Sequence, residues 1–411
     1  MTMVWQECYE PWMIHPQTAA PPPRIALPAI AAVFAGSNRA HVLTVEGEIQ
    51  SLPLGQARLI LHKKPVLLCH APYTRGKLGL EEIQAFDVLE LFAFVHPTTF
   101  AVPTPHGLCM ALGIKPAASA EDQPFALMDI ASALLGDLQR DPWKAKADPL
   151  EIAKVMGLHG KGWPWTPYVL AALGETYHPQ EQIAARKALN IWQHLPEWAE
   201  EAPEPPPAHH AVTAAEARER LKTLLGPEAE EREQQFEYAE ALIPAFAPPL
   251  QKQDSEETTP HIVIAEAGTG IGKTLGYLAP ASVWAEKNGG TVWISTYTKN
   301  LQRQIDQELS RLYPDPTLKD THVAIRKGRE NYLCLLNLEE TAAGAGLARH
   351  PNQAIAAGIM ARWAAATRDG DLTGTDYPGW LPGLLGHAQT SGLADRRGEC
   401  IYAACPHYTR C

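Results

Sequence analysis

A glycine-rich turn between two regular segments restricts the fold of this chain more than any other feature of the sequence. Residues 261–267, HIVIAEA, are rich in β-branched residues, and the run from Ala267 to Thr274 reads AGTGIGKT. The residues from Leu275 to Lys287 are compatible with a helix. Strand, glycine turn and helix in this order predict the first unit of a sheet that is flanked by helices.

The same alternation continues toward the C-terminus. A second apolar run, Thr291 to Tyr297, precedes a segment from Leu301 to Leu312 whose apolar residues recur at spacings of three and four. A third strand is expected from His322 to Arg326. Alternating strands and helices predict a parallel sheet that binds ligands at the carboxyl ends of its strands.

The residue types in the glycine turn suit a triphosphate. Glycines let consecutive backbone amides converge on a phosphate, and the following helix adds an effective charge of about +0.5 at its N-terminus. Lys273 would neutralise the β and γ phosphates, and the Thr274 hydroxyl would ligate Mg²⁺. The turn therefore predicts binding of ATP and Mg²⁺, with Lys273 and Thr274 in the catalytic role. The remaining members of the phosphate cradle would be Ala267, Gly268, Thr269, Gly270, Ile271 and Gly272.

The turn is similar to the AxTGxGKT pattern of superfamily 2 helicases, because Ala267 replaces the usual first glycine. Upstream, Arg232 and Gln235 form an RxxQ pattern at about the distance where that superfamily places a glutamine that reads adenine. An amide can pair with both the donor and the acceptor on the edge of adenine. The resemblance implies that Arg232 and Gln235 belong to the ATP site, although their surroundings also allow a solvated helix.

Hydroxyl and amide side chains follow the second predicted strand. Thr296, Thr298 and Gln302 can hydrogen-bond phosphates without reading bases, which suits contacts to a nucleic-acid backbone. Thr298 is also a suitable N-cap for the helix that follows it. The residues alone leave both interpretations open.

Four of the seven cysteines lie after the glycine turn, at Cys334, Cys400, Cys405 and Cys411. Thiolates are ligands of zinc and of iron–sulfur clusters. The CxxC pairs of many zinc sites are absent, and three closely spaced cysteines with one distant cysteine favour a 4Fe–4S cluster. Structural zinc is the alternative.

Several segments together resemble the DinG-type (XPD-like) iron–sulfur helicases of superfamily 2. The segment KGRENYLC, from Lys327 to Cys334, resembles the one that carries the first cluster cysteine of that family. EAGTGIGKT, from Glu266 to Thr274, is similar to its nucleotide motif, and STYTKNLQRQ, from Ser295 to Gln304, is similar to its motif Ia. The resemblance covers about 180 residues, Arg232 to Cys411, and includes the last three cysteines.

The resemblance implies an ATP-dependent DNA helicase that moves 5′ to 3′ on single-stranded or forked DNA. Thr296, Thr298 and Gln302 would contact the DNA backbone. Lys327, Arg329 and Tyr332 would form a further DNA-facing edge, for which a solvated turn is the alternative. The implied ligands of a 4Fe–4S cluster are Cys334, Cys400, Cys405 and Cys411.

The sequence departs from the family after the cysteines. We find no DEAH-like acidic box and no second motor domain, and without the acidic box ATP could bind but would not be hydrolysed properly. We expect the N-terminal portion of a longer helicase, inactive by itself. A non-hydrolysing protein that binds nucleotide and nucleic acid, with a structural zinc or iron–sulfur site, is the alternative.

The N-terminal part faintly resembles a DnaQ-like 3′–5′ exonuclease in the segments His70–Gly79, Phe86–Pro97 and 103–114. Such nucleases hold two metal ions with carboxylates that begin in the opening strand. The corresponding strand here, AAVFAG, has none, and we expect Asp87 and Glu90 to be surface or capping residues. The expectation is an exonuclease-like scaffold without exonuclease chemistry.

The predicted fold class is α/β, and 411 residues favour several domains. We expect a degenerate exonuclease-like (RNase H-like) domain at 1–194 and a Pro/Glu-rich linker at 195–212. A partial RecA-like motor domain with a parallel P-loop sheet would follow at 213–330, and a helical iron–sulfur domain at 331–411.

Charge and cysteine content bear on partners and compartment. The net charge is −11, but fifteen acidic and five basic residues lie between Glu197 and Glu257, so the rest of the chain is nearly neutral. The balance therefore does not exclude a DNA-binding face. The sparse, odd cysteine count and the absence of an apolar leader predict a cytoplasmic protein that is not bound to membranes. We also expect a monomer.

Overall fold

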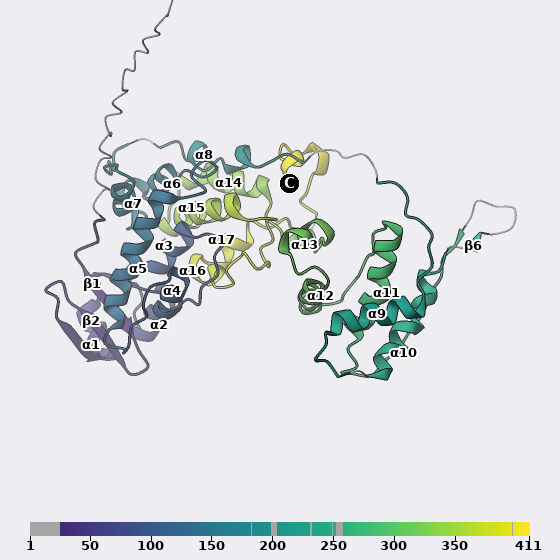
Figure 1. Cartoon of the computed structure of the whole chain (residues 1–411). Helices are drawn as coiled ribbons and strands as arrows, with labels where there is room; N and C mark the ends of the chain where they lie inside the picture. The colour runs from purple at the N-terminus through teal and green to yellow at the C-terminus, as the bar shows by residue number, and fades with distance from the viewer. Residues whose placement is uncertain are drawn as a thin grey trace, which may run out of the picture. The chain divides into compact units, whose positions relative to one another are not determined.

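The computed structural model describes residues 25–181, 183–198, 204–230, 232–248, 250–251, 258–396 and 398–411 (Figure 1). These residues belong to two compact units. The first unit combines Met1–Trp198 with Gly328–Cys411, and the second is Ala199–Lys327. The segment that carries the four C-terminal cysteines therefore packs in the same unit as the N-terminal part of the chain.

The first unit contains a mixed five-stranded sheet. Its order is β3-β2-β1-β4-β5, in which β2 pairs antiparallel with β1 and β3, whereas β1, β4 and β5 are parallel. Val42 of β2 faces Val33 of β1, and Ala31 of β1 faces Val66 of β4. The strands are β1 Ala31–Ala35, β2 Arg39–Leu43, β3 Ile49–Pro53, β4 Pro65–Leu68 and β5 Gln84–Asp87.

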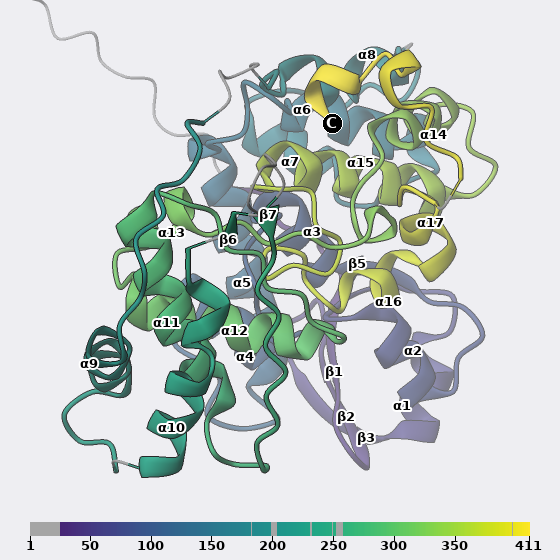
Figure 2. The ribbon, with the colours of Figure 1, turned by 90° about the vertical axis from the view of Figure 1, so that its right-hand side faces the viewer.

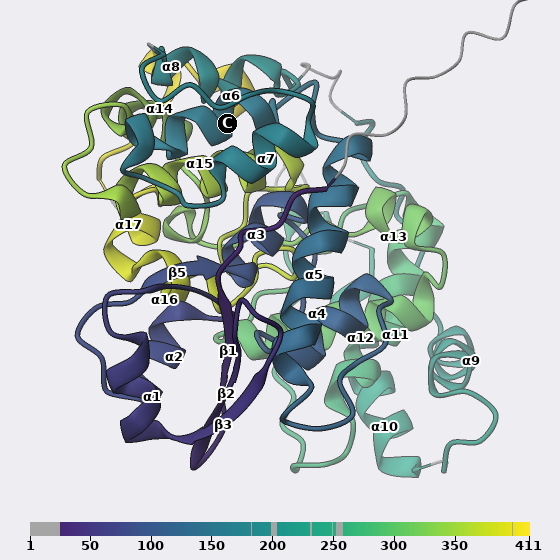
Figure 3. The ribbon, with the colours of Figure 1, turned by 90° about the vertical axis from the view of Figure 1, so that its left-hand side faces the viewer.

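Helices cover both faces of this sheet, as Figure 3 shows. Side chains alternate between the faces of a strand. Val33 and Val66 accordingly pack with α1 and α2, whereas Ala32 and Leu67 pack with α3 and α5. The bounds are α1 Leu54–Leu61, α2 Ala71–Leu78, α3 Val88–Val95 and α5 Gln123–Asp137. The predicted α/β class is confirmed for this unit, and the predicted strand at Ala31–Gly36 and helix at Phe125–Leu138 are present.

A helical layer completes the first unit and draws on both ends of the chain. Its central helix, α15, is buried on all sides and contacts α3, α6 and α14 (Figure 2). A helix that is apolar all round suits such a position. The bounds are α4 Pro105–Leu112, α6 Pro149–Met156, α7 Thr166–Ala172, α8 Ala185–Ala188, α14 Leu335–Ala345, α15 Pro351–Ala366, α16 Leu381–Leu385 and α17 His387–Ser391.

One cation lies within this core. Arg362 of α15 is fully buried and forms an ion pair of 2.8 Å with Asp141. Its Nε donates to the Phe94 carbonyl at 3.0 Å, and its Nη1 donates to the Ala147 carbonyl at 2.7 Å. A buried guanidinium needs such partners, because burial of an unpaired charge is costly.

The second unit is mainly helical among its described residues. Helix α9 begins at a capping box, in which Thr213 accepts from the Glu216 amide and the Glu216 carboxylate accepts from the Thr213 amide. Leu221 of α9, Phe236 of α10 and Leu278 of α11 form the core. The bounds are α9 Ala214–Leu225, α10 Glu233–Ala241, α11 Lys273–Asn288, α12 Lys299–Leu312, α13 Pro316–His322, β6 Leu250–Gln251 and β7 Thr258–Thr259.

The parallel sheet expected in the second unit is not formed, and the predicted strands at 261–267, 291–297 and 322–326 are wrong for this structure. All three segments are described, and none has strand pairing. The side chains of Ile262, Ile264 and Trp293 are 82%, 94% and 81% exposed. A parallel strand makes all its backbone hydrogen bonds to neighbouring strands, so an apolar run without such neighbours stays extended and unpaired.

Within the described residues, no helix is long and apolar enough to cross a membrane.

Of the two carboxylates of the exonuclease-like part, Asp87 is buried and Glu90 is half-buried. Asp87 caps α3 by accepting from the Leu89 amide at 2.9 Å, and it also accepts from the amides of His70 and Ala71. The capping role expected for Asp87 is confirmed. Glu90 is half-buried: burial, and after it the charge of Asp87, raise its pKa to about 8, while a hydrogen bond from the Trp163 indole opposes the shift.

We predict that Glu90→Gln stabilises the protein at high pH and not at low pH. The folded-state pKa of about 8 exceeds the ordinary value of 4.5, so the folded chain holds the extra proton between these values and loses stability as the pH rises through them. Glutamine has no such proton. Urea unfolding at about pH 4, 7 and 9 would measure a difference that grows by up to about 1.4 kcal/mol per pH unit. A difference independent of pH would contradict this prediction.

Candidate nucleotide and thiol sites

The glycine turn and the start of α11 form the first candidate site. Gly270 and Gly272 have φ of 83° and 82°, a region that residues with a Cβ adopt only with strain. Gly272 is the N-cap residue of α11, so the helix begins at Lys273. The first backbone amides of a helix have no partner within the helix, so this helix end is the part of the turn predicted to bind phosphate.

Lys273 folds back over the turn. Its Nζ donates to the carbonyl oxygens of Ala267 and Gly268 at 2.9 and 2.8 Å. Thr274 hydrogen-bonds the Tyr277 side chain, which opposes the rise that burial causes in the pKa of Tyr277. The two residues predicted to serve phosphate and Mg²⁺ thus lie side by side at the start of the helix.

The RxxQ residues contact the same turn. Arg232 Nη1 donates to the Gly270 carbonyl at 3.0 Å, and Gln235 Nε2 donates to the Gly272 carbonyl at 2.9 Å. Gln235 is 4% exposed, so the solvated-helix alternative is wrong for this residue. The fold therefore brings together two motifs that are separated by more than thirty residues.

A tyrosine that the sequence analysis did not single out supports this arrangement. Tyr238 lies one helical turn after Gln235, and a Cβ on Gly276 would lie 2.7 Å from its ring. Gly276 thus allows α10 to pack closely against α11. The spacing of Gln235 and Tyr238 on one helix face was the available signal.

The residues predicted to contact DNA divide between the two units. Thr298 is the N-cap of α12 and accepts from the Leu301 amide at 3.3 Å, which confirms its capping role. Gln302 Nε2 donates to the Arg326 carbonyl at 2.9 Å. Thr296 donates to the Thr298 carbonyl at 3.3 Å, and Lys327 ends the second unit.

The other predicted DNA residues lie in the first unit, beside the cysteines. Arg329 Nη2 donates to the Tyr402 hydroxyl at 2.8 Å, and its guanidinium lies 4.6 Å from the centre of that ring. The Tyr332 backbone bridges to Asp371. Tyr402 is 60% exposed, so it presents an aromatic surface that the sequence analysis did not identify.

The four C-terminal cysteines lie near one another. Burial raises the pKa of the Cys411 thiol, and the charges of Cys334, Cys405 and Cys400 raise it further. Burial also raises the pKa of the Cys334 thiol, whereas the Asn337 and Leu336 amides at the start of α14 oppose this rise. The fold therefore gathers into one region three thiols from the last twelve residues and one from far earlier in the chain.

These thiols provide the right chemistry for a soft metal ion or cluster but not a finished metal centre. Among the described residues, no group of three or more histidine, cysteine or carboxylate side chains is arranged to hold a metal ion. Four thiols gathered in one region are nevertheless a donor set that fits iron–sulfur or zinc chemistry. Binding would remove the protons that the raised pKa values retain.

Comparison with known proteins finds similarity to DNA helicases over part of the chain. The chain is 38% identical over 185 residues to the ATP-dependent DNA helicase YoaA of Escherichia coli, a match covering 41% of this chain and 26% of YoaA. It is 41% identical over 108 residues to the ATP-dependent helicase DinG of Mycobacterium tuberculosis, covering 25% and 15% of the two chains. It is 36% identical over 126 residues to a Bacillus subtilis protein named 3′–5′ exonuclease DinG, covering 30% and 12%.

The matched regions span about a quarter or less of these relatives. No family model matches the chain, and no solved structure matches it. Over these parts of its length the chain is similar to several helicases of the DinG and YoaA type, and its glycine turn is contacted by the RxxQ pair.

Proposed function

We propose that this chain provides the nucleotide-binding part of an ATP-dependent DNA helicase. The observation that carries the proposal is the contact of Arg232 and Gln235 with the glycine turn. A turn that only reversed the chain would need no buried glutamine from another helix. Lys273 would release its two carbonyl partners to a triphosphate, Thr274 would hold Mg²⁺, and Gln235 would lie near the base.

The proposed substrate is single-stranded or forked DNA, on which the helicase moves 5′ to 3′. Thr296, Thr298 and Gln302 would contact the backbone in the second unit. Arg329 and Tyr332 would do so in the first unit, where Tyr402 adds a ring on which a base can stack. This assignment is supported by the exposure of Tyr297, which is 99% exposed between the two threonines.

The proposed cofactor beside Arg329 is a 4Fe–4S cluster on Cys334, Cys400, Cys405 and Cys411. Its support is the gathering of the four thiols in one region, where the charges of Cys334, Cys405 and Cys400 raise the pKa of the Cys411 thiol. Such a cluster would supply a rigid cross-link between α14 and the last residues of the chain. Zinc, which also takes four thiolates, is the competing occupant.

The N-terminal sheet is proposed to be an exonuclease-like scaffold without nuclease chemistry. An RNase H-like scaffold has a mixed sheet in which the second strand alone runs against the others, as here. Its first strand, β1, has no carboxylate, and Asp87 already accepts from three backbone amides. A metal ion would have to displace those amides.

We predict that Lys273→Ala weakens ATP binding roughly 10- to 100-fold, because a charge-assisted contact worth about 1.5–3 kcal/mol is lost. Equilibrium binding of a fluorescent ATP analogue would measure the change. Lys299→Ala is the matched control, since Lys299 also begins a helix of the second unit and is exposed. Equal affinities of Lys273→Ala and the native chain would refute the site.

We predict that Cys405→Ala lowers the iron content of anaerobically purified chain to less than half and removes its visible absorption. Cys69→Ala is the control, because Cys69 is buried in the first unit far from the last twelve residues in sequence. Iron and acid-labile sulfide analysis measures both variants. Zinc in place of iron in the native chain would overturn the cluster, and undiminished iron in Cys405→Ala would remove this residue from the ligand set.

A further inference from the structure

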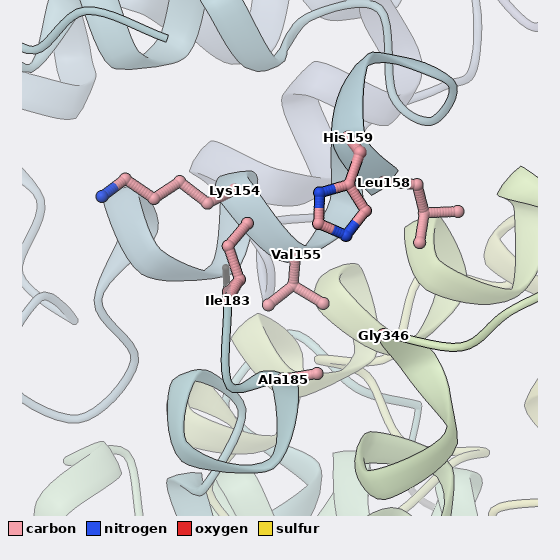
Figure 4. Close-up of a pocket in the computed structure, with 7 residues that line it drawn as sticks. All are labelled: Lys154, Val155, Leu158, His159, Ile183, Ala185 and Gly346. Atoms are coloured by element: carbon pink, nitrogen blue, oxygen red, sulfur yellow. The ribbon is translucent and has the colours of Figure 1, made fainter. Parts of the chain in front are cut away.

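The helices between the first and second predicted cluster cysteines pack into the N-terminal part of the chain. A Cβ on Gly358 of α15 would lie 2.4 Å from the Met156 side chain of α6. A Cβ on Gly346, after α14, would lie 3.1 Å from Ala185 of α8. Figure 4 shows Ala185 and Gly346 beside a cavity of about 20 Å³, which has room for about one water molecule. The helices between Cys334 and Cys400 are thus closely packed against the N-terminal part of the chain.

The last turn of the chain is held by the residues that end the N-terminal part. The Trp198 amide donates to the Thr409 carbonyl, and the Trp198 indole donates to the Tyr408 carbonyl, both at 2.8 Å. The rings of Trp198 and Tyr408 meet edge to face, with centres 5.5 Å apart. Arg410 forms an ion pair of 2.6 Å with Glu197.

A second set of contacts holds the same turn through His407. His407 is 4% exposed, and its Nε2 lies 2.7 Å from the Glu339 carboxylate of α14. Arg186 of α8 pairs with the same carboxylate. The ring of Trp192 meets the His407 ring edge to face, with centres 5.8 Å apart. The N-terminal part therefore contacts all four residues of the segment 407–410.

We propose that the N-terminal part of the chain is a scaffold that positions the cysteine loop, residues 400–411. The clasp consists of Arg186, Trp192, Glu197 and Trp198 on one side and Glu339, His407, Tyr408 and Arg410 on the other. Cys405 and Cys411 flank the clasped residues, so fixing 407–410 restricts both thiols at once. The role toward a metal cluster rests on the proposed function, whereas the role in ordering the loop does not.

The ordering of the loop can be tested without a metal. In the full-length, metal-free chain, Trp198→Ala should speed amide hydrogen exchange in residues 400–411 at least threefold and leave the N-terminal sheet unchanged, because local opening follows the loss of local contacts. Glu339→Gln should have the same effect more weakly, since it keeps an acceptor but removes the charge. Trp293→Ala, at an 81% exposed tryptophan of the second unit, is the matched control and should change nothing.

The outcomes separate the scaffold from the cluster. Unchanged exchange of the loop in both Trp198→Ala and Glu339→Gln would overturn the scaffold, whatever metal the chain binds. Faster exchange together with at least a twofold loss of iron after anaerobic purification would support the scaffold role toward a cluster. Faster exchange in a chain that binds no iron even when native would keep the scaffold and reject the cluster.

Discussion

The buried ion pair of Arg362 and Asp141 is the interaction on which the first compact unit depends. Arg362 is carried by a central helix that comes from the cysteine-bearing segment, whereas all its partners belong to the N-terminal part. Loss of one member of such a pair leaves an uncompensated buried charge and costs about 3–5 kcal/mol. The pair therefore favours this packing of the two segments, because the partners of Arg362 Nε and Nη1 all come from the N-terminal part.

Helices could be predicted from the sequence more reliably than strands, for a physical reason. The helices expected from Leu275, from Leu301 and around Thr213–Leu225 are present because caps and periodicity act within a few residues. A strand needs partners elsewhere in the chain, and the expected strands at 261–267 and 291–297 lack them among the described residues. The strands β1 and β4 form because their partners are present in the N-terminal sheet.

The candidate sites show the same division between local and distant information. The glycine turn was predictable because its geometry depends on its own residues. Burial of Gln235 against that turn required knowledge of how α10 and α11 pack. The clasp around His407 joins residues more than 200 positions apart, such as Trp198 and Tyr408, and no spacing in the sequence indicates it. The proximity of the four cysteines could be predicted, because their thiols are candidate ligands of one metal site. The residues that hold the cysteine loop in place could not be predicted.

Lys273 hydrogen-bonds the turn that it belongs to, and this affects how a ligand can bind there. Its ammonium group rests on two carbonyl oxygens of the glycine turn before any phosphate arrives. An incoming anion would replace these carbonyl oxygens as the partner of the Lys273 ammonium group, and it would not have to order a flexible loop. If the turn binds a triphosphate as proposed, less of the intrinsic affinity would be lost to ordering the receptor.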